Sequence, residues 1–371
     1  MIKIVSGKGI VEIIALFAVT LLFGFSIANA AIATAKVSII TSSLNSAQFT
    51  YFAYILDAVI FSILILIALR RHHSKTLLFK ALEFVVVAFA SFFVFLVIFA
   101  MLITGYVGIA GDYVLAAASA IILMIAKELH SRVKDAATIL SSIGIGILLG
   151  INFPFLYAMV ILAIVAIYDY IAIFMTRAMV KFDKELIAMN IAFLISVSDI
   201  QAMPLSSFNK KEEEKYEEYL IKSHEADDPK FKKILKQGKL PVVSQVSLGE
   251  GDLSLPLMVA ISAYATFFNY AFTGIIMGGA LVGIMLTMAL LKKYKKPLPA
   301  IPPLFCFISI AAGIGVLILR GFSGILYQQA IFAGLGVVIL LFTIYSLFRE
   351  TKEQEHQVKA KNVRAAAAGR R

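Results

Sequence analysis

Residues 154–175 read PFLYAMVILAIVAIYDYIAIFM, an apolar run whose one charged side chain is Asp169. A run of about 20 apolar residues is long enough to cross a bilayer as an α-helix. Similar runs recur along the chain, which has 371 residues, 60% of them hydrophobic and 15% charged. This composition excludes a soluble globular protein, and the length of the runs excludes the short alternating strands of a membrane barrel. The sequence therefore predicts an all-α polytopic membrane protein.

Ten membrane-spanning helices are predicted, at 9–35, 50–69, 77–106, 113–126, 137–152, 154–180, 248–270, 272–291, 300–319 and 323–347. Lys and Arg gather in alternate connections and in both terminal segments, and such residues stay on the cytoplasmic side of a membrane. The N-terminus, the long polar loop and the C-terminal tail are therefore predicted to be cytoplasmic. Topology also accounts for the net charge of +11, so the charge does not indicate a nucleic-acid partner.

The predicted organisation has six parts: a five-helix scaffold at 1–152, a sixth helix at 153–182, a partly disordered cytoplasmic loop at 183–247, the seventh to ninth helices at 248–319, an extra helix at 320–347 and a basic tail at 348–371. Small residues at helical spacing predict close helix packing. They are Gly144, Gly146 and Gly150 in the fifth helix, and the pairs Gly274/Gly278 and Gly279/Gly283 in the eighth.

Ionisable side chains at membrane depth are costly and are candidates for function. The candidates are Glu12, Asp57, Glu83, Asp169 and Asp252. For the first three we expect structural roles: Glu12 and Glu83 lie near helix ends, where water, or Lys80 beside Glu83, can satisfy them. Asp57 can hydrogen-bond a neighbouring helix. Asp169 lies about 12 Å from the cytoplasmic end of its helix, and Asp252 begins the next span from the same side, so these two can meet at one depth.

Two aspartates a few ångströms apart cannot both ionise cheaply, so one keeps its proton and the pair can polarise a shared water. One carboxylate then serves as base and the other as acid in peptide hydrolysis. Gly249 and Gly251, on either side of Glu250, would let a substrate backbone approach Asp252 because no Cβ intervenes. An aspartate pair in a membrane is equally compatible with a proton or cation relay.

Three motifs make the chain resemble the GxGD intramembrane aspartyl proteases of the presenilin and signal peptide peptidase type. Tyr168-Asp169 resembles the YD motif of that family, and Gly249-Glu250-Gly251-Asp252 resembles its GxGD motif. The third is the PAL motif, formed here by Leu298, Pro299, Ala300, Ile301 and Pro302, with Ile in place of the final Leu. The motifs follow one another in the family's order on the sixth, seventh and ninth helices, and the resemblance covers about 9–319.

The resemblance implies a nine-helix presenilin-like bundle in which Asp169 and Asp252 are the catalytic pair and the PAL segment shapes the active site. Glu250 stands at a position that is often apolar in relatives, and we expect it to point away from the pair, toward water or a Lys. The tenth helix is either an addition or a split of the family's last helix around Arg320-Gly321. A cytoplasmic loop between the catalytic helices makes the chain look presenilin-like.

A substrate helix must unwind before its peptide bond can be cut, and its freed backbone groups need partners. The residues before GxGD have a strand-like composition; they are Val242, Val243, Ser244, Gln245 and Val246. Pro297 and Pro299 keep the PAL segment from regular helix. We hypothesise that both segments pair with the substrate as a small sheet. The alternative is that 242–246 simply begins the seventh helix.

The predicted partners are transmembrane-helix substrates and the lipid bilayer, and the sequence is compatible with a homo-oligomer and with accessory subunits. No cofactor or metal is indicated, and Cys306 is the one cysteine. A proton- or cation-coupled transporter or leak channel that uses the intramembrane aspartates is the alternative from another class, although it would predict an internal repeat. A prepilin-peptidase-like enzyme and a proteolytically silent family member are the nearer alternatives.

Overall fold

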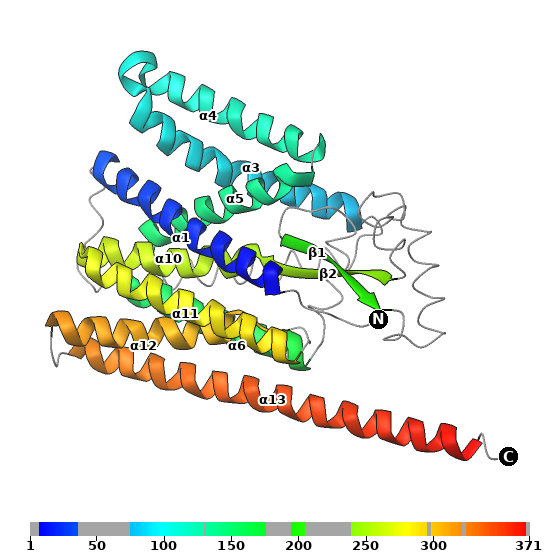
Figure 1. Ribbon diagram of the computed structural model, residues 1–371. Coiled ribbons are helices and arrows are strands. Elements are labelled where there is room, and N and C mark those ends of the chain that lie inside the picture. The colour runs from blue at the N-terminus through cyan, green and yellow to red at the C-terminus, as the bar shows by residue number, and fades with distance from the viewer. Residues whose placement is uncertain are drawn as a thin grey trace.

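A computed structural model describes residues 7–35, 75–129, 131–175, 194–204, 239–294, 298–320 and 324–368. In these residues the chain forms a bundle of α-helices and one small sheet (Figure 1). The predicted helical bundle is confirmed, and the sheet is an addition to it. The second predicted helix, at 50–69, lies outside the described residues.

The elements are α1 (Gly7–Ala35), α3 (Lys75–Leu102), α4 (Thr104–Leu129), α5 (Ser131–Asn152), α6 (Phe155–Tyr170), a π-helix (Ile171–Met175), β1 (Leu194–Pro204), β2 (Lys239–Gly249), α10 (Glu250–Phe267), α11 (Tyr270–Tyr294), α12 (Ile301–Arg320) and α13 (Gly324–Ala368). Within the described part, eight helices are long and apolar enough to cross a membrane. The protein is therefore an integral multi-pass membrane protein.

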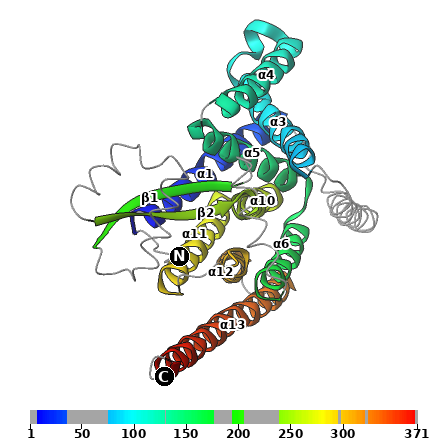
Figure 2. The same ribbon diagram turned by 90° about the vertical axis from the view of Figure 1, so that its right-hand side faces the viewer.

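The centre of the bundle is α10, which is buried at almost every position from Leu253 to Ala265. Figure 2 shows α10 between α5 on one side and the group of α6, α11 and α12 on the other. Two of the glycines of α5 allow this packing. A Cβ on Gly146 would lie 2.9 Å from Leu257 Cδ2, and one on Gly150 would lie 2.7 Å from Ile261 Cβ. Distances this short leave no room for a larger residue, as predicted for the fifth helix.

The eighth predicted helix, α11, uses one of its two glycine pairs. A Cβ on Gly279 would lie 2.6 Å from Ala311 Cβ, and one on Gly283 would lie 2.8 Å from Leu304 Cα, so both glycines pack on α12. Among the described residues, a Cβ on Gly274 or Gly278 would meet no atom within 4 Å. The predicted close approach is therefore confirmed for Gly279/Gly283 and stays a prediction for Gly274/Gly278.

The strands β1 and β2 form a two-stranded antiparallel sheet in which Ile195 pairs with Leu248 and Val197 with Val246. Side chains alternate between the faces of a strand, so these four residues share one face. Ile195, Val246 and Leu248 are buried in the hydrophobic core. β1 and most of β2 belong to the long polar loop predicted at 183–247, of which residues 183–193 and 205–238 lie outside the described part.

The C-terminal helix α13 is separate from α12 and runs back along it in the opposite direction (Figure 1). It is 45 residues long, and so extends through most of the segment predicted as a basic tail. Figure 1 also shows the first turns of α1, the sheet and the C-terminal end of α13 at one end of the bundle, and the turn between α3 and α4 at the other.

Candidate active site

Asp169 lies one residue before the end of α6 and is only 7% exposed. Its Oδ2 accepts a hydrogen bond of 3.2 Å from the backbone N–H of Ile301, the first residue of α12. The first N–H groups of a helix have no partner within that helix, so the carboxyl group of Asp169 satisfies one of them. The contact joins the YD and PAL segments, which are far apart in the sequence. Tyr168, by contrast, is 57% exposed.

Asp252 is the third residue of α10 and caps the start of its own helix. Its Oδ2 accepts a hydrogen bond of 3.0 Å from the backbone N–H of Gly249. A Cβ on Gly249 would lie 3.2 Å from this oxygen, which is tight, whereas a Cβ on Gly251 would meet no atom within 4 Å. Gly249 therefore leaves room for the Asp252 carboxyl group, and Gly251 leaves open space beside it.

The PAL segment is irregular where the sequence predicted it to be. Leu298 and Pro299 have no regular secondary structure, and α12 begins only at Ile301. Pro299, Ala300 and Ile301 are all buried. The helices that carry the three motifs, α6, α10 and α12, pack against one another. The YD and PAL segments thus meet through the bond between Asp169 and Ile301, and the GxGD motif begins a helix that packs on both of their helices. Pro297 lies outside the described residues.

The residues before GxGD form a strand, not the beginning of the seventh helix. Val242–Val246 lie within β2, which continues to Gly249, and α10 begins at Glu250. Their backbone pairs with β1 from Gln201 to Val197. The sequence analysis missed β1, although the alternation of Ile195 and Val197 with serines is a signal for a half-buried strand.

Glu250 is buried and accepts a hydrogen bond from the hydroxyl group of Ser141 on α5. Ser142 also donates to the backbone oxygen of Glu250, at 3.5 Å. The expectation that Glu250 would point toward water or a Lys is therefore wrong, because its partner is a serine hydroxyl on the central packing face of α5. Sequence reasoning missed Ser141, which is 109 residues away.

A family model described as signal-peptide peptidase, presenilin aspartyl protease matches residues 10–325. The chain belongs to this family. The protein is accordingly an intramembrane aspartic endopeptidase, and the predicted family and fold class are confirmed. A solved structure described as a presenilin family intramembrane aspartate protease is similar to this protease, with a TM-score of 0.47 and 18% identity over 81% of this chain and 96% of that one. No curated protein matches the chain.

The family match ends where α13 begins, and α13 follows α12 as a helix of its own. A side-chain hydrogen bond joins α13 to α6 beside Asp169. The hydroxyl groups of Tyr170, which follows Asp169, and of Ser346 on α13 are 2.9 Å apart. Sequence reasoning also missed Ser346, because nothing in the local sequence distinguishes it from other membrane serines.

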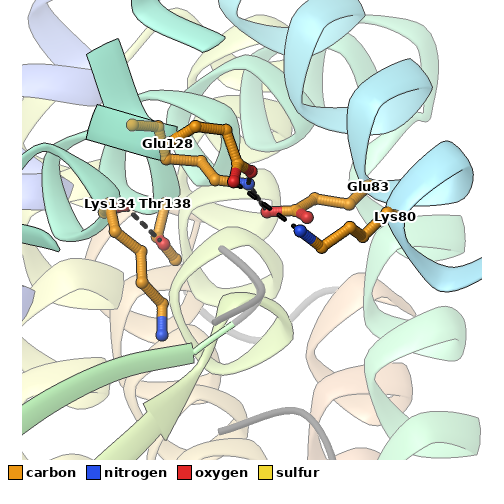
Figure 3. A network of polar contacts seen from close by, with 6 residues as sticks. Lys80, Glu83, Glu128, Lys134 and Thr138 are labelled. Atoms are coloured by element: carbon orange, nitrogen blue, oxygen red, sulfur yellow. Dashed lines mark hydrogen bonds and ion pairs between the residues drawn. The ribbon is translucent and has the colours of Figure 1, made fainter. Parts of the chain in front are cut away.

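The other carboxylates that the sequence singled out are Glu83, Glu12 and Asp57. Glu83 of α3 pairs with Lys127 of α4, and both side chains are almost fully buried. Lys80, the partner expected for Glu83, instead pairs with Glu128 at 3.7 Å. Figure 3 shows Lys80, Glu83 and Glu128 meeting between α3 and α4, beside Lys134 and Thr138 of α5. The structural role expected for Glu83 stays a prediction, which its buried ion pair with Lys127 supports. Glu12 is exposed, and Asp57 lies outside the described residues.

Proposed function

We propose that Asp169 and Asp252 are the catalytic pair of this protease and that they hydrolyse peptide bonds within transmembrane helices of membrane proteins. The observation that carries the proposal is the hydrogen bond from the Ile301 amide to Asp169 Oδ2, which draws the YD helix onto the PAL segment. Asp252 begins α10, which packs on both α6 and α12. The order and packing of the three motifs thus favour one shared site.

In the proposed reaction, the ionised aspartate takes a proton from a water molecule while the water oxygen attacks the carbonyl carbon of the substrate. The protonated aspartate hydrogen-bonds the developing oxyanion. The C–N bond then breaks, the departing amine takes up a proton, and the pair returns to a state that shares one proton. The two carboxyl groups titrate as a unit, so neither role belongs permanently to one residue.

The substrate must offer an unwound backbone to this site, and β2 is suited to hold it. β2 leads directly into Gly249 and α10, and within the described residues one of its edges pairs with β1. We propose that the other edge, over 242–246, pairs with the unwound substrate by strand addition. The irregular PAL segment at Leu298 and Pro299 supplies backbone groups from a second side.

Proline substitutions test the strand pairing. Backbone N–H groups of successive strand residues point to opposite edges, so Val243→Pro and Ser244→Pro each remove a donor from a different edge of β2. One variant should weaken the pairing with β1, and the other should raise the KM for substrate with little change in thermal stability. Full activity in both variants would exclude strand addition to β2.

Asparagine substitutions test the catalytic pair. Asn can still accept the hydrogen bonds from Ile301 and Gly249, so Asp169→Asn and Asp252→Asn keep these contacts and remove only the acid–base function. We expect each variant, purified in detergent and given a single-span substrate, to lose cleavage by at least about 10²- to 10⁴-fold. Glu12→Gln, an exposed carboxyl change on α1, is the control. Cleavage that survives either aspartate change removes that residue from the mechanism.

The positive charges of the connections support a cytoplasmic N-terminus, long loop and C-terminus. The structure places the first turns of α1, the sheet and the end of α13 at one end of the bundle (Figure 1), which agrees with a common side for all three. We propose that this side is cytoplasmic, so that the protease favours substrates whose N-terminus lies outside.

A further inference from the structure

The helix α13 is packed tightly against the rest of the protease, although it lies beyond the family match. Its buried face carries Phe332, Gly336, Ile339, Thr343 and Leu347, at the spacing of one helix face. A Cβ on Gly336 would lie 2.8 Å from Cys306 Cα of α12, and the rings of Phe332 and Phe305 meet edge to face. Thr343 and Leu347 are fully buried. Such close contacts show that α13 is an integral part of the bundle.

The polar contact of α13 lies beside the candidate catalytic residue. Tyr170 follows Asp169 directly, and its hydroxyl group lies 2.9 Å from Ser346 Oγ. Successive residues of an α-helix point about 100° apart around its axis. Asp169 is therefore bonded to Ile301 of α12 on one side of α6, and Tyr170 is bonded to Ser346 of α13 on another. Two contacts from adjacent residues to two different helices determine the rotation of α6 about its own axis.

The helical conformation of the backbone changes directly after Tyr170. Regular α-helix ends at Tyr170, and a π-helix follows from Ile171 to Met175. A π-helical turn is wider than an α-helical turn and is frequently found at functional sites. The hydrogen-bond pattern of the backbone therefore changes directly after Asp169 and Tyr170, the two residues that bond to α12 and α13.

We propose that α13 is a built-in positioning element of the protease, and that Ser346 holds Tyr170 so that α6 presents Asp169 in its productive orientation. The proposal rests on the proposed catalytic role of Asp169. Tyr170 and Ser346 are positioning residues, because they act through Asp169. A small rotation of α6 would move the Asp169 carboxyl group away from the reacting atoms, and displacements of about 1 Å can cost as much as 10²-fold in rate.

The test uses the full-length protease and a single-span substrate. Tyr170→Phe and Ser346→Ala each remove one hydroxyl group of the pair. We expect each to lower kcat about three- to tenfold while KM stays within about twofold. The double variant should lose no more than the single variants, since both remove the same contact. Ser346→Thr, which keeps a hydroxyl group, should restore most of kcat.

Two matched controls distinguish positioning from general loss of side chains. Thr343→Val removes a hydroxyl group from the same helix, but that group donates to Ile339 O of α13 itself. Tyr345→Phe makes the Tyr-to-Phe change at a side chain that is 63% exposed. Both controls should keep the kcat of the wild type.

Three results would overturn the positioning role: an unchanged kcat in Tyr170→Phe and Ser346→Ala, losses that multiply in the double variant, or an equal loss in Thr343→Val. Failure of the underlying proposal has a different signature, because Asp169→Asn would then continue to cleave. An inactive Asp169→Asn together with a fully active Tyr170→Phe would reject only the role of α13.

Discussion

The backbone amide of Ile301 donates a hydrogen bond to Asp169 Oδ2 across 132 residues of sequence. The donor belongs to the first residue of α12, where N–H groups lack partners within the helix. The acceptor lies in the last turn of α6. One bond thus joins the helix that carries YD to the start of α12, which lies within the PAL motif, and it makes the PAL backbone part of the Asp169 environment.

Removing this donor should impair catalysis more than removing the Ile301 side chain. Ile301→Pro eliminates the N–H group at the first position of α12, where the proline ring is compatible with a helix. Ile301→Ala loses most of the side chain and keeps the N–H group. Because hydrogen bonds to charged groups contribute about 1.5–3 kcal/mol, we expect kcat to be at least about tenfold lower in Ile301→Pro than in Ile301→Ala. Equal kcat values in the two variants would show that the bond does not matter for turnover.

The bond between Ser141 and Glu250 should be important for stability. Ser141→Ala leaves the buried Glu250 carboxyl group without this donor, which should lower the free energy of unfolding by about 1–3 kcal/mol. Adding Glu250→Leu should recover most of that loss, because an apolar pair needs no hydrogen bond. Ser26→Ala is the control, since the exposed Ser26 hydroxyl group donates only within its own helix, to Leu22 O. Thermal unfolding in detergent compares the stability of the wild type, Ser141→Ala, the double variant and Ser26→Ala. A double variant as unstable as Ser141→Ala would contradict this account.

The two ion pairs of α3 and α4 should differ strongly in their effect on stability. Glu83 and Lys127 are 2% and 1% exposed, whereas Lys80 and Glu128 are 49% and 52% exposed. Lys127→Met removes the ammonium group that pairs with the buried Glu83 carboxylate and should cost about 3–5 kcal/mol. Lys80→Ala should cost less than about 1 kcal/mol.

The double variant Glu83→Leu/Lys127→Met removes both buried charges and should unfold within about 1 kcal/mol of the wild type. These comparisons use the same unfolding measurement. A loss in the double variant that equals the loss in Lys127→Met would show that the charge pair itself, and not the buried carboxylate that remains after removal of Lys127, determines stability.

Glycine-to-alanine changes along α11 should separate the helix face that packs on α12 from the face with open space. Gly279→Ala and Gly283→Ala force a methyl group into contacts of 2.6 Å and 2.8 Å, and overpacking of this kind costs about 1–3 kcal/mol. Gly274→Ala and Gly278→Ala have open space and should be neutral or stabilising by up to about 1 kcal/mol, since Ala favours the helix. Equal destabilisation by all four would contradict the packing of α11 on α12.

Cysteine labelling should determine which side of the membrane holds the sheet. The native Cys306 is buried, so the wild-type protein is the background control. Tyr106→Cys lies at the turn between α3 and α4, where the native side chain is 91% exposed, and Lys239→Cys lies at the start of β2. A thiol reagent that cannot cross membranes, added outside intact cells, should label Tyr106→Cys and leave Lys239→Cys unlabelled until the cells are broken. The reverse pattern would invert the proposed topology.

The sequence predicted most of the spans and both candidate aspartates for physical reasons that act locally. Helix length follows from bilayer thickness, so the apolar runs at 7–35, 270–294 and 301–320 could be located to within a few residues. Asp169 and Asp252 stand out because a carboxyl group is costly at membrane depth. The same reasoning failed for the partner of Glu83, since the choice between Lys80 and Lys127 depends on how α3 packs against α4.

The lengths of the apolar runs, their polarity and the three short motifs can be read directly from the sequence. They predicted the membrane-protein class, the positions of most spans and the protease family. The tertiary structure alone paired β1 with β2, Glu250 with Ser141, Asp169 with Ile301 and Tyr170 with Ser346. The last three contacts join residues 109, 132 and 176 positions apart. Such contacts depend on the rotation and depth of each helix, and hydropathy carries no information about the rotation of a helix that is apolar on every face.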